Sequence, residues 1–202
     1  YAILLGVALC SLFENKKGNY PVDVYVLDMG ISAKSKERLG VLEKKYGFVI
    51  KYLLFDRRLF EKIPLADLVK SGHNVSIEIY HRVFLARYLP SSCKRILDLD
   101  TDLVFRGDIA EVFNTDLEGK TLGAVAEHYQ EERKKEQLKK LCEGALRLQA
   151  APEGSFYFNA GMLLIDLELW RKRGVEEKLL KLINDHPDKL WSHEQDALNV
   201  VL

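Results

Sequence analysis

The chain has 202 residues, enough for one domain with a substantial core, and its 48% hydrophobic and 30% charged residues are ordinary for a folded globular protein. Its 30 basic residues equal its 30 acidic residues, so the charge gives no support for a nucleic-acid-binding protein, which normally carries a basic excess. The three cysteines are widely spaced and form no Cys-x-x-Cys pair. This pattern argues against a disulfide framework and a cysteine zinc site, and it favours reduced thiols in the cytoplasm.

Helices and strands are predicted in alternation along the first half of the chain. Apolar residues recur at helical spacing near the start, and short apolar runs rich in β-branched residues predict buried strands. The expected elements are a helix from Tyr1 to Lys17, a strand from Val22 to Leu27, a helix from Ser32 to Tyr46, a strand from Phe48 to Phe55, a helix from Ser76 to Tyr88 and a strand from Arg95 to Leu99.

The same alternation continues to the end of the chain. The expected elements are a helical turn from Asp108 to Phe113, a strand from Thr121 to Ala126, a charged helix from Gln130 to Leu148, a strand from Gly161 to Asp166, a helix from Leu167 to His186 broken near Gly174, and a final helix from His193 to Leu202. This order predicts an α/β fold with a mostly parallel central sheet flanked by helices. Such a sheet normally opens with a strand, whereas this chain opens on a helix, so we expect the first strand to be missing.

A cluster of aspartates, Asp98, Asp100 and Asp102, follows the predicted strand from Arg95 to Leu99. Residues two apart in a strand point to the same side, so Asp100 and Asp102 converge on one ion if the strand geometry persists. Ligands of open α/β sheets bind at the carboxyl ends of the strands. Carboxylate oxygens suit Mg²⁺ or Mn²⁺, ions that commonly bridge to substrate phosphates, so the cluster is a candidate metal site from which Asp98 is excluded.

Three other interpretations compete with this one. A calcium loop of the EF-hand type fails, because Leu103 and Ile109 occupy the positions that need Gly and Glu. The run Asp100-Thr101-Asp102-Leu103-Val104 resembles the nucleophile motif of haloacid dehalogenase-type phosphatases, but that motif normally lies near the start of its domain, and no paired aspartates follow to hold magnesium. Aspartates that merely cap a turn are the third interpretation, and two spaced aspartates alone leave it as strong as the metal site.

Four segments of the sequence carry a resemblance to a known family. They are Tyr1 with Gly6 to Leu12, Arg95 to Val104, Phe158 to Asp166 followed by Trp170, and Glu194 to Asn199. In order and in register they resemble glycosyltransferase family 8, in particular the bacterial lipopolysaccharide galactosyl- and glucosyltransferases, with glycogenin a more distant relative. The first segment resembles the helix that follows the family's uridine-contacting loop, and the second resembles its metal-binding Asp-x-Asp motif. The resemblance covers essentially the whole chain.

The resemblance assigns roles to individual residues. It implies that Asp100 and Asp102 bind the metal, with Asp100 also near the donor sugar, and that Glu127 is an acidic contact to the sugar, on a looser alignment. Gln195 matches the residue that faces the reacting carbon, with Glu194 beside it. The nucleotide-sugar contacts that the resemblance implies are Tyr1, Arg82, Asp100, Asn159 and Gly161.

The resemblance also implies a nucleotide-diphospho-sugar transferase (GT-A type) fold over residues 1–202, as a single incomplete catalytic domain. The implied reaction is the retaining transfer of galactose or glucose from a UDP-sugar to a saccharide or glycolipid acceptor, with Mn²⁺ or Mg²⁺, in lipopolysaccharide or other surface glycan synthesis. A histidine ligand and a lysine near the diphosphate are expected in a C-terminal segment that is absent here. That segment could also contact the inner face of the membrane. A phosphatase and a sugar-nucleotide-binding protein without turnover remain the alternatives.

Overall fold

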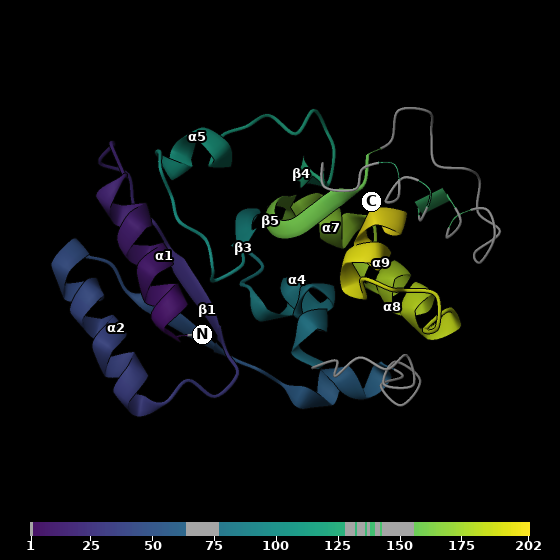
Figure 1. Cartoon of the computed structure of the whole chain (residues 1–202), viewed down its shortest axis with the longest axis horizontal. Helices are drawn as coiled ribbons and strands as arrows, with labels where there is room; N and C mark the ends of the chain where they lie inside the picture. The colour runs from purple at the N-terminus through teal and green to yellow at the C-terminus, as the bar shows by residue number, and fades with distance from the viewer. Residues whose placement is uncertain are drawn as a thin grey trace. The chain divides into compact units, whose positions relative to one another are not determined.

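The computed structural model describes residues 2–63, 77–127 and 156–202, together with Glu132, Glu136, Leu138, Lys139 and Cys142. They form two compact units (Figure 1). Unit 1 comprises Tyr1–Asp56 and Leu99–Asp116, and unit 2 comprises Arg57–Asp98 and Leu117–Leu202. In the described part of the chain, no helix is both long and apolar enough to cross a membrane.

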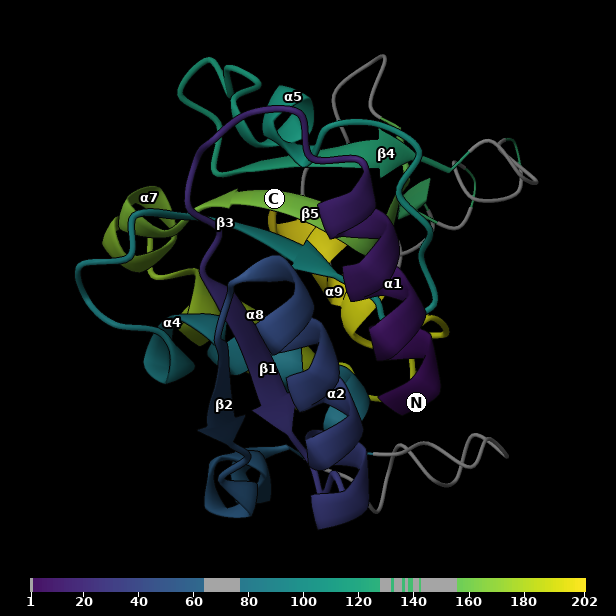
Figure 2. The ribbon, with the colours of Figure 1, turned by 90° about the vertical axis from the view of Figure 1, so that its left-hand side faces the viewer.

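Unit 1 is a small α/β layer. It contains α1 (Ala2–Glu14), β1 (Val24–Asp28), α2 (Ala33–Tyr46), β2 (Ile50–Leu54) and α5 (Ile109–Phe113). The strands β1 and β2 pair in parallel, and α1 and α2 lie side by side against them (Figure 2). The helices α1 and α2 and the strands β1 and β2, with the segment just before β2, contribute apolar side chains to one core. This core consists of Leu9, Val24, Leu39, Phe48 and Ile50.

The helix α2 illustrates why local sequence predicted this unit well. Its N-cap Ser32 accepts a hydrogen bond from the backbone of Ser35, and it ends at Gly47, whose φ of 70° is left-handed. A hydroxyl at the N-cap and a glycine after the last turn are the two strongest local signals of helix ends. The predicted helix from Ser32 to Tyr46 is therefore confirmed.

Unit 2 holds the larger sheet and most of the helices. Its elements are η1 (Arg57–Lys62), η2 (Ile77–Phe84), α4 (Leu85–Tyr88), β3 (Arg95–Leu99), which leads into unit 1, β4 (Leu122–Ala126), β5 (Phe158–Asp166), α7 (Leu167–Lys172), α8 (Val175–Asp185) and α9 (Glu194–Val201). The strand β5 lies between β3 and β4 (Figure 2). Its fully buried side chains include Leu163 and Ile165, which share the core with Phe84, Trp170, Leu179, Ile183 and Leu198.

The direction of the strands corrects the expectation of a mostly parallel sheet. The pair β1–β2 is parallel, but β4 and β5 are antiparallel. The α/β class is correct, whereas the sheets are small and partly antiparallel. An apolar run indicates that a strand is buried on both faces, but it does not indicate the direction of that strand, because burial depends on what covers the sheet.

The pairing of β4 with β5 contains a large irregularity. Ala124 lies opposite Leu163, but the next residue, Val125, lies opposite Asn159. The three residues of β5 between those partners, numbers 160–162, therefore have no counterpart on β4. We call this segment the β5 bulge. Bulges bend a strand, redirect its side chains and are over-represented next to active sites.

Two predicted elements differ clearly from the structure. The strand expected from Gly161 begins at Phe158, so Asn159 lies inside β5 and not before it. The helix expected from Ser76 to Tyr88 is the 3₁₀ helix η2 followed by the short α4. Its apolar residues Ile77, Tyr80 and Val83 recur every three positions, which is the period of a 3₁₀ helix.

Two further predictions concern the second half of the chain. The break near Gly174 is confirmed, because Gly174 adopts a φ of 60° between α7 and α8. The expected helix from Gln130 to Leu148 lies mostly outside the described residues. Within it Leu138 and Cys142 are buried and pack with Tyr157.

Candidate functional site

The aspartates Asp100 and Asp102 lie beyond the strand, which ends where predicted. The strand β3 ends at Leu99, and Asp102 lies in the turn that follows it. The side chains of Asp100 and Asp102 are both exposed. Aspartate is disfavoured in strands and favoured in turns, because its carboxylate can hydrogen-bond nearby backbone groups. The strand alternation on which their convergence was based therefore does not reach Asp102, and a shared ion stays a prediction.

Unit 1 anchors the chain that follows these aspartates onto α1. The Ser11 hydroxyl accepts a hydrogen bond from Phe105 N at 3.0 Å, and Asn15 Nδ2 donates one to Phe105 O at 2.9 Å. Asp108 then caps α5 by accepting from Ala110 N at 3.0 Å. The two exposed carboxylates are thus at the start of a segment whose other end is fixed by one side chain of α1 and one that directly follows it.

The two aspartates fit a hard divalent cation. A cation such as Mg²⁺ is commonly held by one or two carboxylates, with water and substrate phosphates completing its coordination. Asp100 and Asp102 supply two exposed carboxylates within three residues of one another. Among the residues that the structure describes, no set of three or more His, Cys, Asp or Glu side chains is arranged to hold a metal. The donor set therefore suits an ion that binds together with a phosphate-bearing substrate.

Asp98 belongs to a different environment, in unit 2. Its Oδ2 accepts a hydrogen bond from Arg82 Nε at 2.6 Å, and the Arg82 Nη1 donates to Glu194 Oε1 at 3.0 Å. The Arg82 residue is 5% exposed and Glu194 is 8% exposed. Buried charges are tolerated only when paired, so Arg82 holds the end of β3 and the start of α9 together. The expectation that Arg82 contacts the donor stays a prediction, and the structure shows its guanidinium between two carboxylates.

The side chain of Gln195 points from α9 toward β5. Its Oε1 accepts from Ala160 N at 2.9 Å, and its Nε2 donates to the Tyr157 hydroxyl at 3.1 Å. Glu194, its neighbour, turns to Arg82 instead. The two residues that the sequence grouped as catalytic therefore use different contacts. Gln195 is tied to the β5 bulge and Glu194 to the buried arginine.

Glu127 and Asn159 come together at the same bulge. Asn159 Nδ2 donates to Glu127 Oε2 at 3.4 Å, while its Oδ1 accepts from Gly161 N at 2.7 Å. Glu127 directly follows β4, and its backbone N donates to Tyr157 O at 2.7 Å. A carboxylate and a carboxamide on adjacent strand ends can bind sugar hydroxyls. Tyr1, the remaining predicted contact, lies outside the described residues.

Three residues near Gln195 were missed by sequence reasoning. Asn199 Oδ1 accepts from Phe158 N at 2.7 Å, and its Nδ2 donates to Phe158 O at 3.0 Å. Asp196 accepts from the Tyr157 hydroxyl at 2.6 Å. A signal for Asn199 was present, since residues four apart share one face of a helix and Gln195 precedes Asn199 by four. No sequence signal pointed to Tyr157, whose partner is 39 residues away.

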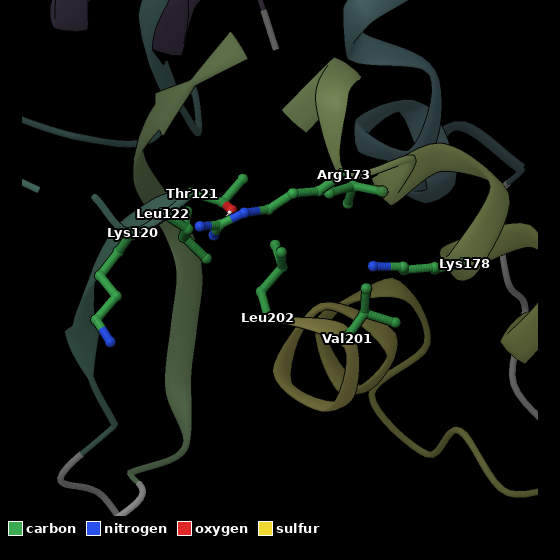
Figure 3. Close-up of a pocket in the computed structure, with 8 residues that line it drawn as sticks. Lys120, Thr121, Leu122, Arg173, Lys178, Val201 and Leu202 are labelled. Atoms are coloured by element: carbon green, nitrogen blue, oxygen red, sulfur yellow. Dashed lines mark hydrogen bonds between the residues drawn. The ribbon is translucent and has the colours of Figure 1, made fainter. Parts of the chain in front are cut away.

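A cavity of about 290 Å³ lies elsewhere in unit 2 (Figure 3). Its lining includes Thr121, Arg173 and Lys178, and Arg173 Nη1 donates to Thr121 Oγ1 at 2.7 Å. Thr121 precedes β4, whereas Glu127 follows its far end, and six strand steps span about 20 Å. The cavity is therefore separate from the polar residues at the β5 bulge.

Comparison with known proteins identifies the family. The sequence profile described as Glycosyl transferase family 8 matches residues 1–202. The chain belongs to this family. The resemblance seen in the four sequence segments is thus confirmed, and family 8 consists of glycosyltransferases, in agreement with the enzyme class expected from sequence.

Two curated proteins illustrate what this chain is similar to. General stress protein A of Bacillus subtilis is 34% identical over all of this chain and 65% of its own length. A lipopolysaccharide 1,2-glucosyltransferase of Escherichia coli is 27% identical over all of this chain and 55% of its own length. The chain thus spans between about half and two thirds of these relatives.

Solved structures agree with the family assignment. The galactosyltransferase LgtC, in complex with donor and acceptor sugar analogues, is 27% identical with a TM-score of 0.78, covering 99% of this chain and 66% of LgtC. An active-site variant of LgtC, in which a glutamine is replaced by glutamate, is 26% identical with the same TM-score and the same coverage. The chain therefore has the α/β fold of LgtC over nearly all of its length.

Proposed function

We propose that this chain is the donor-binding part of a retaining hexosyltransferase that moves galactose or glucose from a UDP-sugar to a saccharide acceptor. A divalent cation, Mn²⁺ or Mg²⁺, is held by Asp100 and Asp102. Family membership and the relatives that transfer glucose or galactose support this proposal. Lipopolysaccharide or another surface glycan is the acceptor that the bacterial relatives favour, and we place the reaction on the cytoplasmic side of the membrane.

The observation that carries the proposal is how charge is distributed along one short segment. The Asp98 carboxylate is matched by the buried Arg82 guanidinium, while the Asp100 and Asp102 carboxylates are exposed. Two exposed carboxylates at a strand end repel the negative charge of a diphosphate unless a cation lies between the carboxylates and the diphosphate. The segment thus suits a donor that arrives with a divalent ion.

The mechanism follows from the bonds that change. The bond from the anomeric carbon to the diphosphate oxygen breaks, its electron pair stays on the UDP, and the acceptor hydroxyl bonds to the carbon and loses its proton. The cation, when bound, neutralises the charge that develops on the leaving diphosphate. The sugar carbon gains oxocarbenium character, which nearby carbonyl and carboxylate oxygens stabilise.

The residues of this chain have distinct roles in that mechanism. Gln195 and Glu194 act beside the reacting carbon, where an amide dipole and an anionic group favour developing positive charge. Asn159 and Glu127 bind the sugar hydroxyls. Gly161 has no side chain, so the backbone of the β5 bulge can approach the donor sugar closely. Arg82 and Tyr1 are further donor contacts in this proposal. An active-site glutamine in the LgtC relative is consistent in residue type with the role of Gln195.

The proposal is tested by measuring UDP release from UDP-galactose and UDP-glucose by the full-length protein with Mn²⁺ and a panel of saccharide acceptors. We expect acceptor-dependent UDP release that is lost on chelation of the metal and reduced at least about a hundredfold by Asp102→Asn. Asp23→Asn is the matched control, because Asp23 is an exposed carboxylate of unit 1 that pairs with Lys51. Release of inorganic phosphate would indicate a phosphatase, and donor binding without turnover would indicate a binding protein.

A further inference from the structure

The Tyr157 hydroxyl lies between two side chains of α9. It donates a hydrogen bond to Asp196 Oδ1 at 2.6 Å and accepts one from Gln195 Nε2 at 3.1 Å. Tyr157 is 2% exposed and Asp196 is fully buried. The second carboxylate oxygen of Asp196 accepts from Ser192 N at 2.7 Å, which fixes the carboxylate in turn. All four residues belong to unit 2.

This arrangement leaves Gln195 one orientation. A phenol has a single hydrogen, and the Tyr157 hydroxyl donates that hydrogen to Asp196. The phenolic oxygen can then only accept, and Gln195 must present its NH₂ group to it. The carbonyl of the same amide consequently faces the opposite way, toward Ala160. Burial, the larger cause, and the nearby Asp196 carboxylate, the smaller one, raise the pKa of Tyr157 above its usual value. The phenolic hydrogen is therefore present throughout the physiological pH range.

The other end of the amide meets the β5 bulge. Ala160 is one of the bulge residues without a counterpart on β4, and its N–H donates to Gln195 Oε1 at 2.9 Å. A buried backbone N–H without a partner is costly, so this bond replaces a missing ladder bond. The bulge immediately follows Asn159, whose side chain reaches Glu127. The orientation of one amide thus fixes the backbone next to Asn159, whose side chain contacts Glu127, the other candidate sugar contact.

We propose that Tyr157 is a positioning residue that, through Asp196, sets the orientation of the Gln195 amide and thereby holds the β5 bulge in the shape that presents Asn159. Its effect on sugar transfer rests on the proposed function, whereas its effect on the bulge does not. The matched reference residue is Tyr80. It is also a fully buried tyrosine of unit 2, and within the described residues its hydroxyl has no hydrogen-bond partner.

The first test is amide hydrogen exchange of the full-length protein, followed in peptides that span Phe158 to Met162. Tyr157→Phe is expected to raise the exchange of the Ala160 amide about fivefold to tenfold, the effect of losing one net hydrogen bond, while Tyr80→Phe leaves it unchanged. Unchanged exchange in Tyr157→Phe overturns the proposal.

A double-mutant cycle separates positioning from general destabilisation. Gln195→Ala removes the acceptor of the Ala160 N–H directly, so its exchange should rise at least as much as in Tyr157→Phe. Adding Tyr157→Phe to Gln195→Ala should then produce no further increase, because the two act through one bond. Additive increases would show that Tyr157 stabilises the bulge by another route. If Tyr157→Phe does not fold, a rise in Ala160 exchange in Gln195→Ala still supports the hold of the Gln195 amide on the β5 bulge, and no rise refutes it.

The second test is steady-state kinetics on the sugar-transfer reaction. Tyr157→Phe is expected to lower kcat about tenfold or more with the donor KM within about twofold, while Tyr80→Phe keeps both. A Tyr157→Phe enzyme with the wild-type kcat refutes the positioning role. Absence of sugar transfer by the wild-type protein would refute the proposed function instead, and the exchange test would still decide the role of Tyr157.

Discussion

Replacing Asn199 by alanine tests how α9 holds the edge of the candidate site. The Asn199 side chain bonds both the N–H and the carbonyl of Phe158, at 2.7 and 3.0 Å, and also donates to Gln195 O at 2.9 Å. The two bonds to Phe158 join a helix to a strand 41 residues earlier in the chain. Asn199→Ala removes all three without changing the apolar core.

The expected loss follows from those bonds. Each neutral hydrogen bond contributes about 1 kcal/mol net, and the half-buried backbone groups of Phe158 lose their partners without full access to water. The bond to Gln195 O contributes little, because that carbonyl lies at the start of α9, where the backbone N–H of residue 199 is its partner within the helix. We therefore expect the free energy of unfolding to fall by about 2–3 kcal/mol.

The measurement is urea denaturation, with Asn184→Ala as the matched control. Asn184 lies near the end of α8, and among the described residues its exposed side chain donates to Leu180 O alone, at 2.7 Å. Both variants gain the same helix propensity from alanine, so their difference isolates the contacts with Phe158. The control should change the free energy of unfolding by less than about 0.5 kcal/mol. Equal effects of the two variants would refute the reasoning.

Three further predictions concern the same protein. Gln195→Ala should lower kcat about tenfold or more and leave the donor KM within about twofold, and wild-type turnover would falsify its role. Arg82→Met should lower the free energy of unfolding by about 3–5 kcal/mol in urea denaturation, because it removes the buried guanidinium that pairs with the Asp98 and Glu194 carboxylates, whereas the exposed Arg57→Met should have little effect. The hydrogen bond from Tyr20 lowers the pKa of Asp108 below 3.8. The stability that the ionised Asp108 gives the fold is therefore present above about pH 4 and is lost as the pH falls further. Asp108→Asn should consequently flatten the decline of Tm below about pH 4.

Much of the fold was predictable because its signals are local. The strand from Arg95 to Leu99 has the predicted bounds, the helix after Ser32 has a hydroxyl cap, and Gly174 interrupts the helix where expected. Each of these depends on residues within a few positions of one another, which determine the backbone angles directly. The family was recognisable for a related reason, since its four motifs are short and retain their order.

The candidate site was predictable in residue identity but not in contacts. Sequence indicated Gln195 and Glu194 as neighbours with a common role, yet one side chain bonds the β5 bulge and the other bonds Arg82, 112 residues away. It placed Asn159 before a strand, whereas Asn159 lies within β5 at a bulge. A bulge depends on the register of two strands, and no local pattern in either strand specifies it.

Sequence by itself determined where most helices and strands lie, which family the chain resembles, and which carboxylates and amides are candidates for chemistry. Tertiary structure alone decided that β5 runs antiparallel to β4, that Arg82 neutralises Asp98, and that Tyr157 and Asp196 orient Gln195. The reason is physical. Backbone conformation responds to nearest neighbours, whereas the partner of a buried charge or amide is whichever group packing brings within about 3 Å of it, and such groups are often far apart in the chain.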